Sequence, residues 1–239
     1  PGLGWLTTES KLAAAHEASA GDPAEFQRPY LGWWPEARKL QWVIPEAAWN
    51  ATRVDDPDAV DWIGAPMWSV DTSPERTTTS IGLAGDTPGA RCWVEVPRQD
   101  VGTEWAPGAL EALRHEFGGH RVVLDAAGPA ASLKPDLEAR GFDVVELTSR
   151  EVNASCGGLY DDVTATNIRW GGDPEVYAAA KNAVKVNSGE TWRFGRHKST
   201  EDITALYAVA LARHGLITHG VPDYDPVASV IGARRKDDA

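Results

Sequence analysis

The order of β-type and helical segments after residue 65 is the strongest constraint on how this chain folds. Three short β-type runs are separated by turn residues, namely 67–72, 78–84 and 91–97. The first link holds Ser73-Pro74 and the second holds Gly85-Asp86-Thr87-Pro88-Gly89, both typical of turns. Consecutive strands with such short links predict an antiparallel meander.

The next segment alternates between helical and β-type patterns. We expect a helix at about 107–117, a strand at 121–124, a helix at about 130–140 and a strand at 142–147. Glycines follow both helices, as they do at helix C-termini. This alternation implies parallel strands joined by right-handed crossovers.

Further helices are predicted in the C-terminal third of the chain. The first covers about 150–168 and is weakened by Gly157-Gly158, and the second covers about 174–186. The last begins at Asp202, carries apolar residues every three or four positions, and is expected to end at Arg213-His214-Gly215.

Three antiparallel strands followed by two parallel ones, with helices between and after them, is the order of a ribonuclease H-like fold. We therefore predict an α/β fold with a mixed five-stranded sheet flanked by helices. In that order the first and fourth strands are neighbours. The ends of these two strands are then expected to meet at one edge of the sheet.

The 239 residues are expected to form one domain with a preceding arm. We predict an N-terminal arm or linker at 1–65, the α/β domain at 66–220 and a mobile tail at 221–239. Six tryptophans lie in the predicted arm, and packing of the arm onto the domain is the favoured interpretation, although a stacking platform for bases is an alternative. Because the chain starts at Pro1 without a leader, we expect it to be a piece of a longer protein.

Charge limits the partners that the chain can bind. Lysine and arginine total 23 against 35 acidic residues, a net charge of −12, which opposes indiscriminate binding to a polyanion. Binding to nucleic acid would then depend on a local basic patch, a divalent ion or a second domain. No apolar run approaches the roughly 18 residues of a membrane helix, so no membrane partner is expected.

Three aspartates lie at the ends of separate predicted elements. Asp71 and Asp125 close apolar β-type runs, and Asp202 opens the last helix. Divalent cations such as Mg²⁺ take oxygen ligands that converge from several parts of a fold. The sequence therefore predicts a metal site formed by these carboxylates.

Each aspartate also has a purely structural interpretation. Asp71 could start a turn with Ser73-Pro74. Asp202 lies three residues after Ser199, the spacing of a capping box, and a helix N-terminus favours a carboxylate without any metal. A structural role as a turn or helix-cap residue is less obvious for Asp125. The occurrence of all three in fold order favours the metal site.

A cluster of basic residues precedes the third aspartate, namely Arg193, Arg196, His197 and Lys198. In an otherwise acidic chain these side chains are candidates for contacts with DNA phosphates. Arg76, just beyond Asp71, is a weaker candidate. An exposed hairpin tip without a function is the alternative for any one of them.

The segments around the aspartates resemble the nuclease domain of the large terminase subunit of tailed phages. The resemblance lies in Val70-Asp71-Thr72-Ser73-Pro74-Glu75-Arg76, Val122-Val123-Leu124-Asp125-Ala126-Ala127-Gly128-Pro129-Ala130 and Arg196-His197-Lys198-Ser199-Thr200-Glu201-Asp202-Ile203-Thr204-Ala205-Leu206. In the arm, Asp22-Pro23-Ala24-Glu25-Phe26-Gln27-Arg28 and Val43-Ile44-Pro45 are similar to the segment that links motor and nuclease in this family. Pro29 and Ala205 depart from the family pattern at helix boundaries.

The resemblance implies a metal-dependent endonuclease that cuts double-stranded concatemeric phage DNA during genome packaging. It implies two Mg²⁺ or Mn²⁺ ions held by Asp71, Asp125 and Asp202. The implied partners are DNA, the ATPase motor domain of the same protein, the portal protein and the small terminase subunit, in the host cell cytoplasm. The phosphate-binding Gly-x-x-x-x-Gly-Lys-Ser/Thr pattern is absent from the sequence, so no ATPase activity is expected of this part.

Two other functions stay open at this stage. The chain could be another ribonuclease H-like nuclease, such as a resolvase or transposase-like enzyme. It could instead be a docking module without catalysis that binds portal or capsid protein through its tryptophan-rich arm or basic tail.

Overall fold

The computed structural model describes residues 7–19, 26, 42–56, 60 and 63–220. The chain forms two compact units, 1–41 and 42–239. In the first unit, helix α1 (Glu9–Ala18) begins after Thr8, whose hydroxyl accepts a hydrogen bond from the amide of Lys11. The segment Asp22–Arg28 that resembles the family's linker lies outside the described residues except for Phe26, and the predicted tail at 221–239 lies entirely outside them.

The second unit is built on a six-stranded mixed sheet with the strand order β5-β4-β1-β2-β3-β6. The strands are β1 (Ile63–Thr72), β2 (Thr78–Asp86), β3 (Cys92–Val101), β4 (Arg121–Asp125), β5 (Asp143–Leu147) and β6 (Ile168–Trp170). The β1-β2 and β2-β3 pairs are antiparallel, and β1-β4, β4-β5 and β3-β6 are parallel. The predicted ribonuclease H-like arrangement of three antiparallel strands and two parallel ones is confirmed.

Strand β6 adds a sixth member to the five predicted strands. The helix expected at about 150–168 is shorter, because α6 (Ser149–Thr164) ends before Thr166, which adopts a left-handed conformation with φ of 59°. The chain then runs parallel to the start of β3, where Ile168 pairs with Cys92. Gly157 and Gly158 do not interrupt α6.

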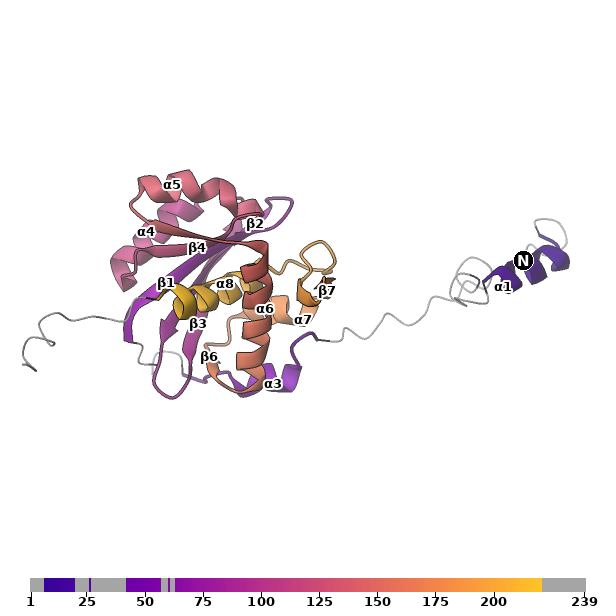
Figure 1. The fold of residues 1–239 in the computed structure, drawn as a ribbon, viewed down its shortest axis with the longest axis horizontal. Helices are drawn as coiled ribbons and strands as arrows, with labels where there is room; N and C mark the ends of the chain where they lie inside the picture. The colour runs from indigo at the N-terminus through magenta and orange to yellow at the C-terminus, as the bar shows by residue number, and fades with distance from the viewer. Residues whose placement is uncertain (1–6, 20–25, 27–41, 57–59, 61–62, 221–239) are drawn as a thin grey trace, which may run out of the picture. The chain divides into compact units, whose positions relative to one another are not determined.

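Helices cover both faces of the sheet (Figure 1). Helix α4 (Ala106–Phe117), the 3₁₀ helix η2 (Pro129–Leu133) and α5 (Lys134–Ala139) bury residues such as Leu110 and Leu137 with Trp68, Val122 and Leu124. Helices α6, α7 (Pro174–Asn182) and α8 (Thr204–His219) form the second core, which includes Met67 and Val123.

The alternation of strand residues decides which side chains reach the α8 face. On β1, Met67 faces the α8 core and Trp68 faces the α4 core. On β4, Val123 faces the α8 core and Leu124 the α4 core. Because side chains alternate with period two, Asp71 and Asp125 both belong to the α8 face.

Helix α8 is buried on all sides from Thr204 to Leu216, as expected for a helix that is apolar around its circumference. It crosses the sheet so closely that a Cβ atom at Gly82 would lie 2.6 Å from the carbonyl carbon of Ala208. The predicted end at Gly215 is wrong, because α8 continues to His219. Gly215 instead permits close packing, since a Cβ there would lie 2.3 Å from Cγ2 of Val123.

A two-stranded hairpin precedes α8. Strands β7 (Lys185–Ser188) and β8 (Thr191–Phe194) pair antiparallel, so the helix predicted at about 174–186 ends earlier, at Asn182. The chain from 195 to 203 then connects β8 to α8.

Part of the segment expected to be arm lies within the compact unit of the sheet. Helix α3 (Glu46–Ala51) buries Trp49 completely, and the carbonyl of Trp49 accepts a hydrogen bond from Nε1 of Trp170 on β6. The hydroxyl of Tyr177 on α7 donates to Oε1 of Glu46. The compact unit therefore starts at residue 42 rather than 66.

Candidate active site

Asp71 and Asp125 lie at the carboxyl ends of neighbouring parallel strands. The register pairs Trp68 with Val122 and Ser69 with Val123, so two residues further along each strand Asp71 comes beside Asp125. Asp71 has no exposed surface and Asp125 is 4% exposed. The expected meeting of these two aspartates at one edge of the sheet is confirmed.

Arg196 lies between the two carboxylates. Its Nη2 donates to Oδ1 of Asp71 over 2.6 Å and its Nε to Oδ2 over 3.3 Å, while Nη1 donates to Oδ2 of Asp125 over 3.2 Å. The guanidinium carbon lies 3.6 Å from the centre of the Tyr207 ring. The sequence predicted Arg196 as a DNA contact, whereas here it neutralises the paired acids.

Burial dominates the electrostatics of this cluster. Desolvation raises the pKa of Asp71 to about 6, the charge and hydrogen bonds of Arg196 oppose that rise, and the charges of Asp125 and Asp202 add to it. Burial alone would lower the pKa of Arg196, but the negative charge of Asp71 and its other neighbours keeps it above the ordinary value. The buried acids therefore depend on a positive charge beside them.

Asp202 is exposed, and hydrogen bonds attach it to residues other than the two buried aspartates. Its Oδ1 accepts from the amide and the hydroxyl of Thr204, over 3.0 and 2.5 Å, and from Nε2 of Gln99 over 3.3 Å. Across the described part of the chain, no group of three His, Cys, Asp or Glu side chains is placed to share one ion. The structure thus brings Asp71 and Asp125 together, whereas Asp202 lies at the end of the loop that carries Arg196 and affects Asp71 only through its charge.

The structural alternatives for the three aspartates have different outcomes. The turn interpretation of Asp71 is wrong, because Ser73 makes the turn contacts by accepting from the amides of Thr77 and Thr78. The capping box with Ser199 is also wrong, since the Ser199 hydroxyl bonds to Val184 and Gly195. Asp202 nevertheless caps the start of α8, because its Oδ1 accepts a hydrogen bond from the amide of Thr204. Asp125 also has a local contact, since its Oδ1 accepts from the amide of Ala127.

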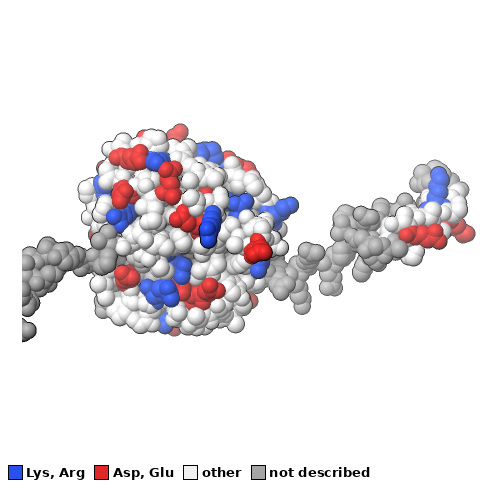
Figure 2. All heavy atoms as spheres, viewed as in Figure 1, with Lys and Arg blue, Asp and Glu red and all other residues white. Residues whose placement is uncertain are grey.

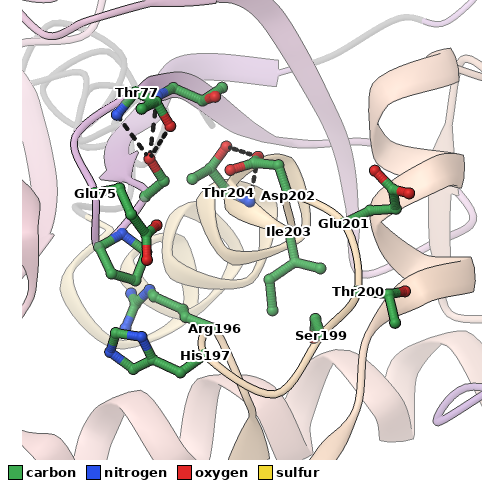
Figure 3. A pocket seen from close by; sticks show the side chains of 13 residues that line it. Glu75, Thr77, Arg196, His197, Ser199, Thr200, Glu201, Asp202, Ile203 and Thr204 are labelled. Atoms are coloured by element: carbon green, nitrogen blue, oxygen red, sulfur yellow. Dashed lines mark hydrogen bonds between the residues drawn. The ribbon is translucent and has the colours of Figure 1, made fainter.

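A cleft of about 330 Å³ opens beside this cluster. It lies between the β1-β2 turn, residues 73–78, and the loop from Arg196 to Thr204 (Figure 3). Arg196 and His197 line one part, and Asp202 with Thr204 lines another. Arg196 lines the cleft and also contacts the two buried aspartates, which are not among the lining residues.

The predicted DNA contacts occupy different environments. Arg193, His197 and Lys198 are exposed around the hairpin and the loop that follows it. Arg76 is held by the protein, because Nη1 donates to the carbonyl of Pro129 and Nη2 to the hydroxyl of Thr103. Figure 2 shows acidic and basic side chains interspersed on the face in view.

Sequence reasoning missed a row of polar residues across the sheet. Asp71 on β1 pairs with Ser80 on β2, and Ser80 pairs with Gln99 on β3. The hydroxyls of Ser80 and Thr204 lie 2.7 Å apart, and Nε2 of Gln99 lies 3.0 Å from the Ser80 hydroxyl. The row connects Asp71 to the start of α8, and only the strand register could have revealed it.

The donor chemistry of this cluster fits a divalent cation. Two buried carboxylates from separate strands already share one positive group, and oxygen ligands are those that Mg²⁺ and Mn²⁺ prefer. Arg196 must release at least one carboxylate before both can face an ion. Asp71 and Asp125 would be the holders, with Asp202 as the third predicted carboxylate.

Solved structures with a similar fold include a phage large terminase and the nuclease domains of two others. The large terminase of bacteriophage HK97 matches with a TM-score of 0.60 at 15% identity, covering 90% of this chain and 52% of the terminase chain. A mutant nuclease domain of the large terminase subunit of bacterial virus Sf6, with manganese, matches at 0.53 with 12% identity, covering 73% of this chain and 99% of that domain. The large terminase nuclease of thermophilic phage G20c, with cobalt, matches at 0.51 with 14% identity, covering 75% and 98%.

These similarities establish that the chain has the fold of terminase nuclease domains, and it spans about half of the HK97 protein. No protein-family model and no curated protein sequence matches the chain. Within the described residues, the helices are too short or too polar to cross a membrane.

Proposed function

We propose that this chain is the nuclease domain of a phage terminase large subunit, cutting double-stranded concatemeric DNA during genome packaging. The observation that carries this proposal is the buried pair Asp71 and Asp125, bridged by Arg196, which also lines a cleft together with the exposed His197. The fold shared with terminase nucleases supports it, as do the manganese and cobalt in two of those structures.

The three aspartates have distinct roles in the proposed reaction. Asp71 and Asp125 would hold the divalent cations, and Asp202, just before α8, would be the third carboxylate of the site. Two Mg²⁺ or Mn²⁺ ions supply activation of the attacking water and stabilisation of the leaving oxygen. The complete burial of Asp71 excludes bulk water from one side of the site and strengthens its interaction with positive charge.

Binding of DNA depends on the local basic residues, because the chain as a whole repels a polyanion. Arg193, His197 and Lys198, which are exposed on the β7-β8 hairpin and the loop after it, contact backbone phosphates. Such contacts position the duplex without reading its sequence. Arg76 supports the site indirectly by fixing η2, which follows Asp125.

The remaining partners follow from the coverage of the HK97 terminase. In the full-length protein an ATPase motor domain would precede this domain, and portal protein and small terminase subunit would assemble with it at the capsid in the host cytoplasm. No ATPase activity is expected from the chain itself.

The test is nicking of supercoiled plasmid in the presence of Mn²⁺. We expect wild-type protein to nick, and Asp125→Ala to lower the rate by at least about 100-fold, more than the loss of an outer hydrogen-bond partner of a metal ligand typically causes. Asp161→Ala removes an acid that is exposed on α6 and serves as the matched control with wild-type activity.

Equal nicking by wild type and Asp125→Ala would indicate a contaminant and refute the proposed site. A folded wild type that neither nicks plasmid nor binds Mn²⁺ would favour the docking module. Dimeric protein with selective cutting of branched DNA would favour a resolvase-like enzyme.

A further inference from the structure

Arg196 is the feature of the cleft that the proposed reaction leaves unexplained. A residue that only contacted phosphates would extend towards solvent, as Arg193 and Lys198 do. Arg196 is 11% exposed at its side chain and bridges Asp71 and Asp125. It therefore occupies the position that a divalent cation would take between these two carboxylates.

The guanidinium and a divalent cation compete for the same carboxylate oxygens. All three nitrogens of Arg196 that donate to Asp71 and Asp125 point at atoms that an ion would also require. A guanidinium and a divalent cation bound to the same carboxylates would repel each other strongly, because the site is buried. Ion binding thus requires Arg196 to find another partner.

The cleft offers room for such a partner. Arg196 lines the cavity as well as the aspartate pair, and His197 beside it is exposed. A DNA phosphate in the cavity matches the forked donors of a guanidinium as well as a carboxylate does. The Tyr207 ring beneath the guanidinium can support it in both positions, because stacking on an aromatic face leaves the donors free.

We propose that Arg196 is a positioning residue that exchanges Asp71 and Asp125 for a DNA phosphate, so that DNA entry frees both carboxylates for divalent cations. This inference rests on the proposed nuclease function. It makes binding of DNA and binding of metal mutually dependent, since each raises the affinity for the other by the same factor. Without DNA, Arg196 keeps the site neutralised and the domain inactive.

The test measures Mn²⁺ affinity by titration calorimetry, with and without a short phosphorothioate duplex that keeps its backbone charge and resists cleavage. For wild type we expect DNA to raise Mn²⁺ affinity about tenfold, within the usual range of coupling between sites. Arg196→Gln should bind Mn²⁺ about tenfold more tightly than wild type without DNA, and DNA should add less than about twofold.

Two further variants keep the test decisive. Arg196→Lys retains the charge but cannot bridge both carboxylates, so it should change Mn²⁺ affinity in the same direction by a smaller factor even if Arg196→Gln fails to fold. Arg150→Gln removes an exposed charge on α6 and should leave both the affinity and the coupling at wild-type values.

The outcomes separate this inference from the proposed function. If Mn²⁺ binding depends on Asp125 but both Arg196 variants bind it no more tightly than wild type, the exchange is overturned and the nuclease assignment stands. If Mn²⁺ binding survives Asp125→Ala unchanged, the proposed metal site is refuted and the exchange with it.

Discussion

Nε2 of Gln99 lies 3.3 Å from Oδ1 of Asp202, although the two residues are 103 positions apart in the chain. The same nitrogen lies 3.1 Å from the hydroxyl of Thr204 and 3.0 Å from that of Ser80. Ser80 is the cross-strand neighbour of Asp71. Gln99 therefore connects the start of α8 to β2, the strand next to the one that carries the buried aspartate.

We expect Gln99→Leu to lower plasmid nicking by about 10- to 100-fold, the usual cost of removing a group that orients a metal ligand. The reason is that Asp202 loses its link to the sheet while its own carboxylate stays in place. The measurement is kcat together with the Mn²⁺ concentration at half-maximal rate, which should rise. Asp100→Asn, an exposed neighbour on β3, is the control. A wild-type Mn²⁺ requirement in Gln99→Leu would contradict the role.

The exposed basic residues make a separate prediction about DNA affinity. Lys198→Gln should weaken DNA binding equally for all sequences and reduce the slope of log affinity against log salt by about 0.9. Arg193→Gln should act in the same way, because each phosphate contact releases its own counterion. Fluorescence anisotropy over a salt series measures both quantities.

Arg169→Gln provides the matched control for charge. Arg169 lies on β6, beside Trp93 near the start of β3, whereas Gln99 lies towards the other end of that strand. An unchanged slope in Lys198→Gln, or an equal loss in Arg169→Gln, would show that binding is diffuse rather than local to the cleft.

The order of five of the six strands and the pairing of Asp71 with Asp125 were accessible from sequence, because the succession of strands and helices matches the order of a ribonuclease H-like fold. Parallel neighbours end at the same edge, so two aspartates that close adjacent strands must meet there. Gln99 and Ser80 were not accessible, since pairing across antiparallel strands depends on register, which turn length and bulges adjust. Arg196 follows a hairpin, and only the folded loop decides that it turns inward.

Two predictions about helices were wrong, and both concerned glycine residues. Gly215 was expected to end α8, and Gly157-Gly158 to weaken α6. In both places the missing side chain serves close packing instead: Gly215 lies against Val123, and Gly158 against the guanidinium of Arg213. Sequence pattern alone does not distinguish a glycine that ends a helix from one that admits a neighbour.

The pair Gly157 and Gly158 offers a direct test of this packing. A Cβ atom at Gly158 would lie 2.1 Å from Nη1 of Arg213, whereas one at Gly157 would meet nothing within 4 Å. Arg213 cannot move freely, because it is bonded to the buried carboxylate of Asp162 over 2.6 Å. Breaking a buried ion pair costs on the order of 3 kcal/mol.

We therefore expect Gly158→Ala to lower the free energy of unfolding by about that amount, and Gly157→Ala to raise it by about 0.5 to 1 kcal/mol through helix propensity. Urea titration measures both. In an Arg213→Met background the cost of Gly158→Ala should largely vanish, since the obstructing guanidinium is gone. Equal effects of the two alanines would refute the contact.

Asp173 is predicted to make stability depend on pH. Burial, with a smaller contribution from the charge of Glu95, raises the pKa of Asp173 to about 6, and its Oδ2 has no hydrogen-bond partner in the described part of the structure. A carboxyl group with a higher pKa in the folded state holds its proton more tightly there. Its favourable contribution is thus complete below the unfolded value of 3.8 and is lost as the pH rises through about 6.

Asp173→Asn removes this titration while keeping the shape of the side chain. The variant should match wild type near pH 4 and become more stable above pH 6, by on the order of 1 kcal/mol once solvent screening of a partly exposed carboxyl is allowed for. Thermal unfolding across this pH range measures the difference, about 2 to 4 °C for a domain of this size. If wild type instead gained stability relative to the asparagine variant as the pH rose, Asp173 would have to be ionised and favourably paired, contrary to the unpartnered oxygen seen here.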